Sequence, residues 1–202
     1  MMTSRLVGAS VLCLATAACT ATPASTTPSV VASTAPASGE RTGQPIARAE
    51  IETAQRAWCD ALIGIGQEAA NGGDARARAK AKAVIASAYA YDDGGVLFKP
   101  TLTYGEQTFR MTKEGALAYF VGGDPAYPND TGFALKQWKR CEPKIAGVVA
   151  SVDMAVAMGN VYFTDVKGNE VMVDKTFGYR RGENGALKIA LHHSSLPYSP
   201  SK

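Results

Sequence analysis

The sequence is poor in the residues from which metal centres and nucleic-acid interfaces are built. It has 202 residues with 2 histidines and 4 cysteines, and 21 basic against 18 acidic residues give a net charge of only +3. Neighbouring residues of a strand point to opposite faces, so only one of the adjacent His192 and His193 can enter a pocket, whereas a catalytic zinc normally takes three protein ligands. No basic stripe typical of phosphate binding is present. We therefore expect no resident metal and no nucleic-acid partner.

A long apolar run is also missing. The apolar stretch from Leu6 to Ala15 is about half the roughly 20 residues that a transmembrane helix needs. Arg5 precedes it and small residues follow it, a pattern typical of a secretory signal peptide, which we predict over residues 1–18. The rest of the chain is then periplasmic or otherwise exported.

Cys19 directly follows Thr16-Ala17-Ala18, which resembles the lipobox of bacterial lipoproteins, although Thr16 replaces the usual leucine. Two alternatives stay open: lipid attachment at Cys19, which would be the chain's only link to a membrane, or cleavage and release. Residues 19–45 consist mainly of Thr, Ser, Ala and Pro, which cannot bury enough surface to offset the entropy of ordering. They predict a disordered tether.

Residues 46–202 are long enough for one well-buried core and short for two, so we expect a single domain. This part contains only Cys59 and Cys141. In an oxidising compartment two cysteines favour a disulfide, which in the chain-entropy model adds roughly 4 kcal/mol. Two buried free thiols are the alternative.

Periodicity predicts helices first and strands afterwards. Apolar residues recur at helical spacing over 47–70, Gly72-Gly73 ends that helix, and a second helix follows to Tyr91. The other predicted elements are a strand at 96–98, a helix at 112–121, and strands at about 135–150, 153–165, 170–181 and 186–195. This order predicts an α+β domain in which a strongly curved antiparallel sheet wraps the helices and leaves a cone with an open mouth. We expect a homodimer formed through the outer face of the sheet.

Chemistry is expected where the last strand ends, in His192-His193-Ser194-Ser195. Leu187, Ile189 and Leu191 set the core parity, and strict alternation then sends His193 and Ser195 inward and His192 and Ser194 outward. A β-bulge would reverse this assignment. An imidazole with nearby hydroxyl groups suits activation of water and stabilisation of a small oxyanion.

The sequence resembles the iota-class carbonic anhydrases in an ordered series of blocks over most of residues 50–200. The blocks are Val96-Leu97-Phe98-Lys99-Pro100-Thr101, Glu114-Gly115-Ala116-Leu117-Ala118-Tyr119-Phe120-Val121-Gly122-Gly123, Ala157-Met158-Gly159-Asn160 with Tyr162-Phe163-Thr164, Thr176-Phe177-Gly178-Tyr179, and the segment from His192 to Pro200. The resemblance implies the cone of nuclear transport factor 2 and of the calcium/calmodulin-dependent kinase II association domain, a cystatin-like roll.

The same resemblance implies reversible hydration of CO2 to bicarbonate. Some members of that class work without metal and others have been assigned zinc or manganese, so Zn or Mn stays an alternative. By matching motif, the catalytic residues are expected among Thr101, Tyr119, His192, His193, Ser194 and Ser195. In that picture the hydroxyl groups hold water and bicarbonate and the histidine accepts or relays a proton. Phe98, Phe120 and Phe163 are candidates for an apolar wall that binds CO2.

Two alternative functions remain open. The first is a non-enzymatic ligand-binding or association domain, because this fold hosts many unrelated roles. The second is an isomerase or cyclase, which would need a carboxylate in the pocket. Asp153, Asp165 and Asp174 lie on or beside predicted strands, but nothing in the sequence brings them together.

Overall fold

The computed structural model describes residues 43–200. The predictions of a signal peptide, of lipid attachment at Cys19 and of most of the tether lie outside these residues. Its helices are α1 (Arg48–Ala88) and α2 (Lys113–Val121), with 3₁₀ turns η1 (Gly105–Gln107) and η2 (Phe133–Lys136). Its strands are β1 (Leu97–Lys99), β2 (Trp138–Ala150), β3 (Met154–Asp165), β4 (Glu170–Arg181) and β5 (Leu187–Ser195).

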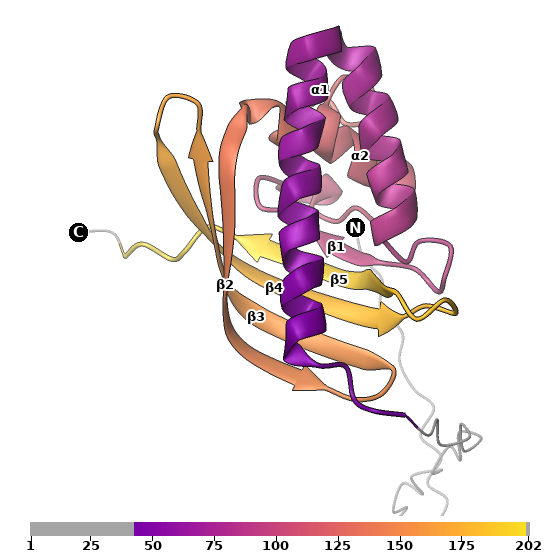
Figure 1. Cartoon of the computed structure of the whole chain (residues 1–202). Helices are drawn as coiled ribbons and strands as arrows, with labels where there is room; N and C mark the ends of the chain where they lie inside the picture. The colour runs from indigo at the N-terminus through magenta and orange to yellow at the C-terminus, as the bar shows by residue number, and fades with distance from the viewer. Residues whose placement is uncertain (1–42, 201–202) are drawn as a thin grey trace, which may run out of the picture. The chain divides into compact units, whose positions relative to one another are not determined.

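Helix α1 consists of two helices that meet at a sharp break. Gly73 has φ 76° and ψ −172°, a conformation that side chains with a Cβ rarely adopt, and the chain turns back at this residue. The predicted stop at Gly72-Gly73 is therefore confirmed. The first half lies across one face of the sheet (Figure 1) and buries a stripe that includes Ile51, Leu62 and Ile65.

The sheet has the order β1-β5-β4-β3-β2. Strands β2 to β5 form the predicted antiparallel meander, whereas β1 adds to the edge parallel to β5, a pairing that the sequence pattern did not indicate. A register shift between Ile145 and Gly147 interrupts the β2–β3 ladder, and bulges of this kind increase twist and bending. Opposite this shift, a Cβ on Gly159 would lie 2.1 Å from the backbone oxygen of Lys144, so only glycine fits there.

Two further contacts hold the helices against the sheet. A disulfide joins Cys59 of α1 to Cys141 of β2. Helix α2 is capped at its N-terminus by Thr112, whose side chain accepts a hydrogen bond from the Gly115 N–H at 3.1 Å, and at its C-terminus by Gly122 with φ 62°. Helices packed on a curved sheet confirm the predicted α+β fold. Within the described part of the chain, no helix has the length and apolar character needed to cross a bilayer.

The outer face of the sheet carries exposed apolar side chains. On β3, Met154, Val156 and Met158 are exposed and alternate with buried alanines. The predicted homodimer would bury this face. It stays a prediction that a measurement of molecular mass in solution decides.

Candidate active site

The end of β5 presents His192 and Ser194 to the interior, which corrects the predicted orientation. His192 is 2% exposed and Ser194 1%, whereas His193 is exposed and Ser195 half-buried. The cause is a β-bulge. Gly178 and Tyr179 of β4 pair with Leu191 and Ile189 of β5, so β5 holds one extra residue and the side-chain alternation reverses after it.

Gly178 permits this arrangement. Leu191, expected in the core, is turned outward by the bulge, and a Cβ on Gly178 would lie 2.7 Å from the Leu191 Cβ. A glycine inside a strand often marks a bulge or a close approach. Gly178 is therefore the signal by which the sequence could have indicated the reversed parity.

Three hydroxyl groups from three elements meet beside β5. Thr101 follows Pro100 at the end of β1, and the parallel pairing of Lys99 with His193 brings it next to Ser194. Its Oγ1 donates a hydrogen bond to Ser194 Oγ at 2.6 Å. Tyr119 of α2 is 5% exposed, and its hydroxyl bonds to the Thr101 side chain. Burial raises the pKa of Tyr119 above its ordinary value, so this phenol stays protonated and can donate a hydrogen bond.

A second row of polar groups runs beside the hydroxyl cluster. Trp58 Nε1 donates to the Tyr89 hydroxyl at 3.0 Å, this hydroxyl lies 2.9 Å from His192 Nδ1, and His192 Nε2 lies 2.9 Å from Lys175 Nζ. Both nitrogens of His192 thus have protein partners. We call these four residues the buried relay. Lys99 Nζ also donates to the Ser194 carbonyl at 2.9 Å.

Sequence reasoning missed Trp58, Tyr89 and Lys175 as site residues. Lys175 could have been found, because it occupies an inward position between Val173 and Phe177 on β4, where a charged residue is unusual. Trp58 and Tyr89 carried no comparable signal, since each fits an ordinary apolar helix stripe.

Burial away from water is the main cause of the shifted pKa values in the buried relay. Burial lowers the pKa of Lys175 to about 7. Burial first, then the charges of Lys175 and His193, hold the pKa of His192 well below its usual range, while burial raises the pKa of Tyr89. His192 is therefore a neutral imidazole at physiological pH.

Aromatic rings enclose this polar row. Phe98 stacks on His192 with ring centroids 4.4 Å apart, and Phe177 lies 4.7 Å from the same ring. Of the other predicted wall residues, Phe163 lies with its centroid 5.9 Å from Lys175 Nζ, and Phe120 packs behind Phe98 at 5.9 Å. All three predicted phenylalanines are buried.

A cleft of about 700 Å³ opens next to the hydroxyl cluster. Thr101, Val173 and Phe133 line its inner part, and Leu196 and Lys136 are among the residues that border it. Thr101 therefore lies between the cleft and the buried Ser194. A small apolar molecule can approach the hydroxyl groups past Val173, Phe133 and Leu196, while Lys136, Asp165 and Lys167 border the same cleft.

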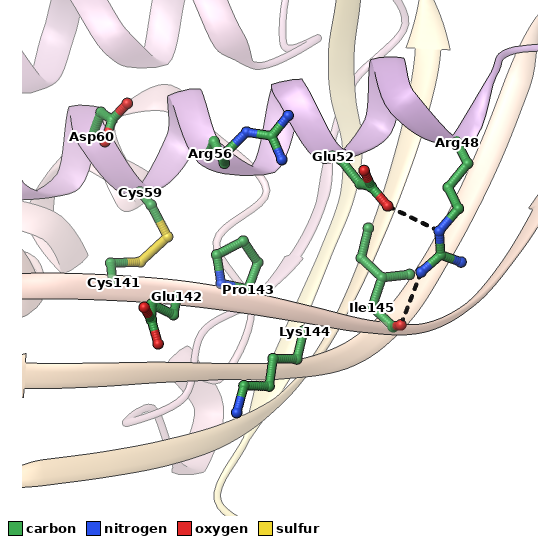
Figure 2. A pocket seen from close by; sticks show the side chains of 10 residues that line it. All are labelled: Arg48, Glu52, Arg56, Cys59, Asp60, Cys141, Glu142, Pro143, Lys144 and Ile145. Carbon is green, nitrogen blue, oxygen red and sulfur yellow. Dashed lines mark hydrogen bonds and ion pairs between the residues drawn. A yellow bond between two sulfur atoms is a disulfide. The ribbon is translucent and has the colours of Figure 1, made fainter.

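A different hollow, of about 530 Å³, lies between α1 and β2 around the disulfide (Figure 2). Arg48, Arg56 and Lys144 line it together with three acidic residues, and none of the predicted catalytic residues does. More charged residues line this hollow than line the cleft at Thr101. The chemistry expected from the sequence is therefore located elsewhere.

The predicted carboxylates do not meet at the hydroxyl cluster. Asp165 accepts hydrogen bonds in the β3–β4 turn, and Asp174 accepts one from Asn160 at 2.8 Å on the opposite face of β4 from Lys175. Asp165 borders the cleft next to Thr101 and Asp153 borders a different hollow, so the three candidates do not converge as the isomerase alternative requires. Residues 43–200 also contain no set of three or more His, Cys, Asp or Glu side chains placed to hold a metal ion.

Known proteins are similar to this chain in sequence and in fold. A family model described as "Metal-independent carbonic anhydrase" matches residues 49–196. A curated protein of that name from Nostoc sp. (strain PCC 7120 / SAG 25.82 / UTEX 2576) is 46% identical over 153 residues, which is 76% of this chain and 75% of the relative. The crystal structure of an iota-carbonic anhydrase from a cyanobacterium, complexed with bicarbonate, is 47% identical, with a TM-score of 0.75 over 77% of this chain and 94% of that one. A weaker likeness, 23% identical with a TM-score of 0.46, joins 73% of this chain to 86% of a structure from Xanthomonas campestris that is described as a calcium/calmodulin dependent protein kinase II association domain.

Fold and site together define an α+β cone protein with a dehydrated cluster of hydroxyl groups inside its curved sheet. Among such proteins, this chain belongs to the family of metal-independent carbonic anhydrases. The description of the family agrees with the expectation that no metal cofactor is needed, and the zinc or manganese alternative loses its basis.

Proposed function

We propose that this protein catalyses the reversible hydration of CO2 to bicarbonate and a proton, with Thr101, Ser194 and Tyr119 holding the reacting water and the bicarbonate. The observation that carries the proposal is the 2.6 Å hydrogen bond between Thr101 and Ser194, bordered by the buried Tyr119 hydroxyl. Membership in the family supports the reaction, and the bicarbonate complex of the cyanobacterial relative supports the substrate.

The three hydroxyl groups divide the work by their donor capacity. Thr101 donates to Ser194, which leaves the Ser194 O–H free to orient a water molecule or a bicarbonate oxygen. The protonated Tyr119 exchanges its hydrogen bond to Thr101 for one to the oxygen on which negative charge develops. Donors fixed in a dehydrated site stabilise such charge more strongly than water does, because they need no reorganisation.

CO2 itself needs only an apolar surface. Phe98 lies beside the hydroxyl cluster, and Val173 and Phe133 line the adjoining cleft, so CO2 would enter through that cleft and meet the held water at Thr101. Phe163 and Phe120 complete the wall from behind.

His192 acts in this scheme by orientation. Both of its ring nitrogens are engaged, by Tyr89 and by Lys175, so neither is available to remove a proton from water directly. The role implied by the resemblance, in which the histidine accepts or relays a proton, is therefore not the one we propose. His192 fixes the end of β5 and with it the position of Ser194.

The experiment is a stopped-flow assay of CO2 hydration by the full-length protein, with and without a chelator. We expect activity that survives chelation and a fall in kcat/KM of about 100-fold in Ser194→Ala and in Tyr119→Phe, a typical loss for one oxyanion donor. Ser195→Ala and Tyr198→Phe are matched controls, because Ser195 lies on the other face of β5 and Tyr198 is 87% exposed.

The controls should retain wild-type activity. Equal losses in Ser194→Ala and Ser195→Ala would contradict the assigned site. A wild-type protein with no hydration above the buffer rate would contradict the function itself.

A further inference from the structure

Lys175 is a buried base to which the proposed function assigns no role. Its side chain is 5% exposed, and Nζ lies 4.3 Å from the Trp58 ring centroid and 5.3 Å from that of Phe177. Among residues 43–200, no carboxylate is ion-paired with it. An unpaired ammonium in such surroundings is costly, so the amine is neutral unless something in the site requires its charge.

The hydrogen bonds of the buried relay have one direction when Lys175 is neutral. Trp58 Nε1 only donates, and it donates to the Tyr89 oxygen. The Tyr89 O–H can then donate to His192 Nδ1, and Nε2–H donates to the lone pair of Lys175 Nζ. Every polar hydrogen between Trp58 and His192 has an acceptor in this arrangement.

Protonation of Lys175 reverses the last two hydrogen bonds. An ammonium has no lone pair, so it must donate to Nε2, which leaves Nδ1–H to donate to the Tyr89 oxygen. That oxygen then accepts from both Trp58 and His192, and the Tyr89 hydrogen loses its acceptor within the relay. The relay therefore has two states that differ by one proton, and the neutral state is the better bonded.

The reaction itself supplies a reason to charge Lys175. CO2 and water enter the site without charge, whereas bicarbonate carries a negative charge and releases a proton. In a dehydrated site, an anion without a countercharge is strongly disfavoured. Lys175 pairs with Ser194 across β4 and β5, and both side chains are buried on the same face, so its amine lies in the same enclosed region as the hydroxyl cluster.

We propose that Lys175 is the proton acceptor of CO2 hydration and, once protonated, the countercharge of bound bicarbonate. The oxygen of water forms a bond to the carbon of CO2, one carbon–oxygen π pair moves onto oxygen, and one O–H bond of water breaks. The proton from that bond ends on Lys175 Nζ, and it later passes to buffer when bicarbonate leaves. In the reverse direction the ammonium returns the proton. This inference rests on the proposed function.

Few other groups can share this role. The buried Arg110–Asp130 ion pair lies near Tyr119, and the exposed His193 acts on His192 from outside. The other titratable or charged groups that surrounding elements present to this region are His192 on β5, Tyr89 after α1, Tyr179 on β4, Tyr119 on α2 and Lys99 on β1. Burial raises the pKa of each of these tyrosines, and His192 is held neutral with both nitrogens engaged. Lys99 is bonded to the Ser194 carbonyl at the edge of the cluster. Lys175 is the buried group whose pKa, about 7, lies close to physiological pH.

The test compares Lys175→Met with Lys144→Met. Lys144 also lies over an aromatic ring, 4.4 Å from the Tyr162 centroid, but it is exposed to water. We expect kcat/KM for CO2 hydration to rise with pH through the pKa of Lys175 in the wild type and in Lys144→Met. Lys175→Met should lose that rise and about 100-fold in activity, the lower end of the contribution of a positioned base. Wild-type activity and pH profile in Lys175→Met would overturn the proposal.

Two further measurements separate a proton acceptor from a merely structural lysine. Calorimetric titration with bicarbonate at pH 8, in buffers of different ionisation enthalpy, should show proton uptake in the wild type, about 0.4 proton per bicarbonate for a one-unit rise of the Lys175 pKa from about 7 and more for a larger rise, and none in Lys175→Met. If Lys175→Met does not fold, the pH titration of the Lys175 Cε resonance in the wild-type protein decides instead. We expect its midpoint to rise by at least one pH unit with saturating bicarbonate, and an unmoved midpoint would overturn the proposal.

These outcomes are distinguishable from failure of the proposed function. A wild-type protein that hydrates CO2 while binding bicarbonate without proton uptake would overturn only the role of Lys175. A wild-type protein without hydration activity would remove the function on which that role rests.

Discussion

Two regions beside α1 differ in how far their charged residues are exposed to water. The hollow at the disulfide contains six charged side chains, and its Arg48–Glu52 pair is 53% and 39% exposed. The buried relay contains one amine, which is 5% exposed and has its pKa lowered to about 7. Charge in water is screened and interacts weakly, whereas a single amine removed from water becomes a base at neutral pH. Dehydration, rather than the number of charges, distinguishes the candidate active site.

The largest expected effect is a loss of unfolding free energy, without loss of activity, when the disulfide is removed. Replacing both Cys59 and Cys141 by alanine releases a link between residues 82 apart, and in the chain-entropy model this costs about 4 kcal/mol of unfolding free energy. Urea unfolding would measure the loss. The hydration rate of the folded variant at low temperature should equal that of the wild type, because the disulfide contacts none of the proposed catalytic groups. A folded but inactive variant would contradict the separation of the two regions.

A smaller effect should appear in how stability depends on pH. Burial lowers the pKa of Lys175 from its ordinary value of 10.5 to about 7, so between these values the unfolded chain binds more protons than the folded one. The free energy of unfolding then rises with pH, by at most about 1.4 kcal/mol per pH unit from this residue, and the effect is constant below pH 7. Lys175→Met should remove this slope between pH 7 and pH 10.

Unfolding curves of the wild type, Lys175→Met and Lys144→Met between pH 7 and pH 10 would measure this slope. Lys144→Met should keep the wild-type slope, since its ammonium is exposed. Equal slopes in all three proteins would mean that Lys175 is hydrated in the folded state.

The smallest effect is expected in the charged hollow itself. Glu52→Gln removes an exposed i,i+4 ion pair with Arg48 whose Nε–Oε1 distance is 2.9 Å. Such pairs contribute about 0.3 to 0.5 kcal/mol and are screened by salt. The free energy of unfolding of Glu52→Gln, measured at low and at high salt, should therefore differ little from that of the wild type. Its hydration activity should be unchanged. A loss above about 2 kcal/mol would show that this pair is not a surface pair in the ordinary sense.

Much of the fold was predictable because local patterns specify it. The break at Gly72-Gly73, the cap at Thr112 and the four long strands all follow from residues close together in the chain. The parallel addition of β1 was not predictable, because a three-residue strand carries no directional signal.

The candidate site was predictable in composition and not in orientation. The resemblance pointed to Thr101, Tyr119 and the His-His-Ser-Ser segment, but the parity argument chose His193 and Ser195. One extra residue in β5 reversed that choice, and only the ladder with β4 reveals it. Trp58 and Tyr89 became site residues through contacts between segments 31 and 103 residues apart.

The sequence by itself determined which segments are helix or strand and which residue types are available for the chemistry, since both depend on short-range periodicity and composition. Only the tertiary structure decided which side chains face the interior and which of them lose their water. Those two properties depend on strand register and on long-range packing, and they are what turn an ordinary lysine, tyrosine and histidine into a connected buried row.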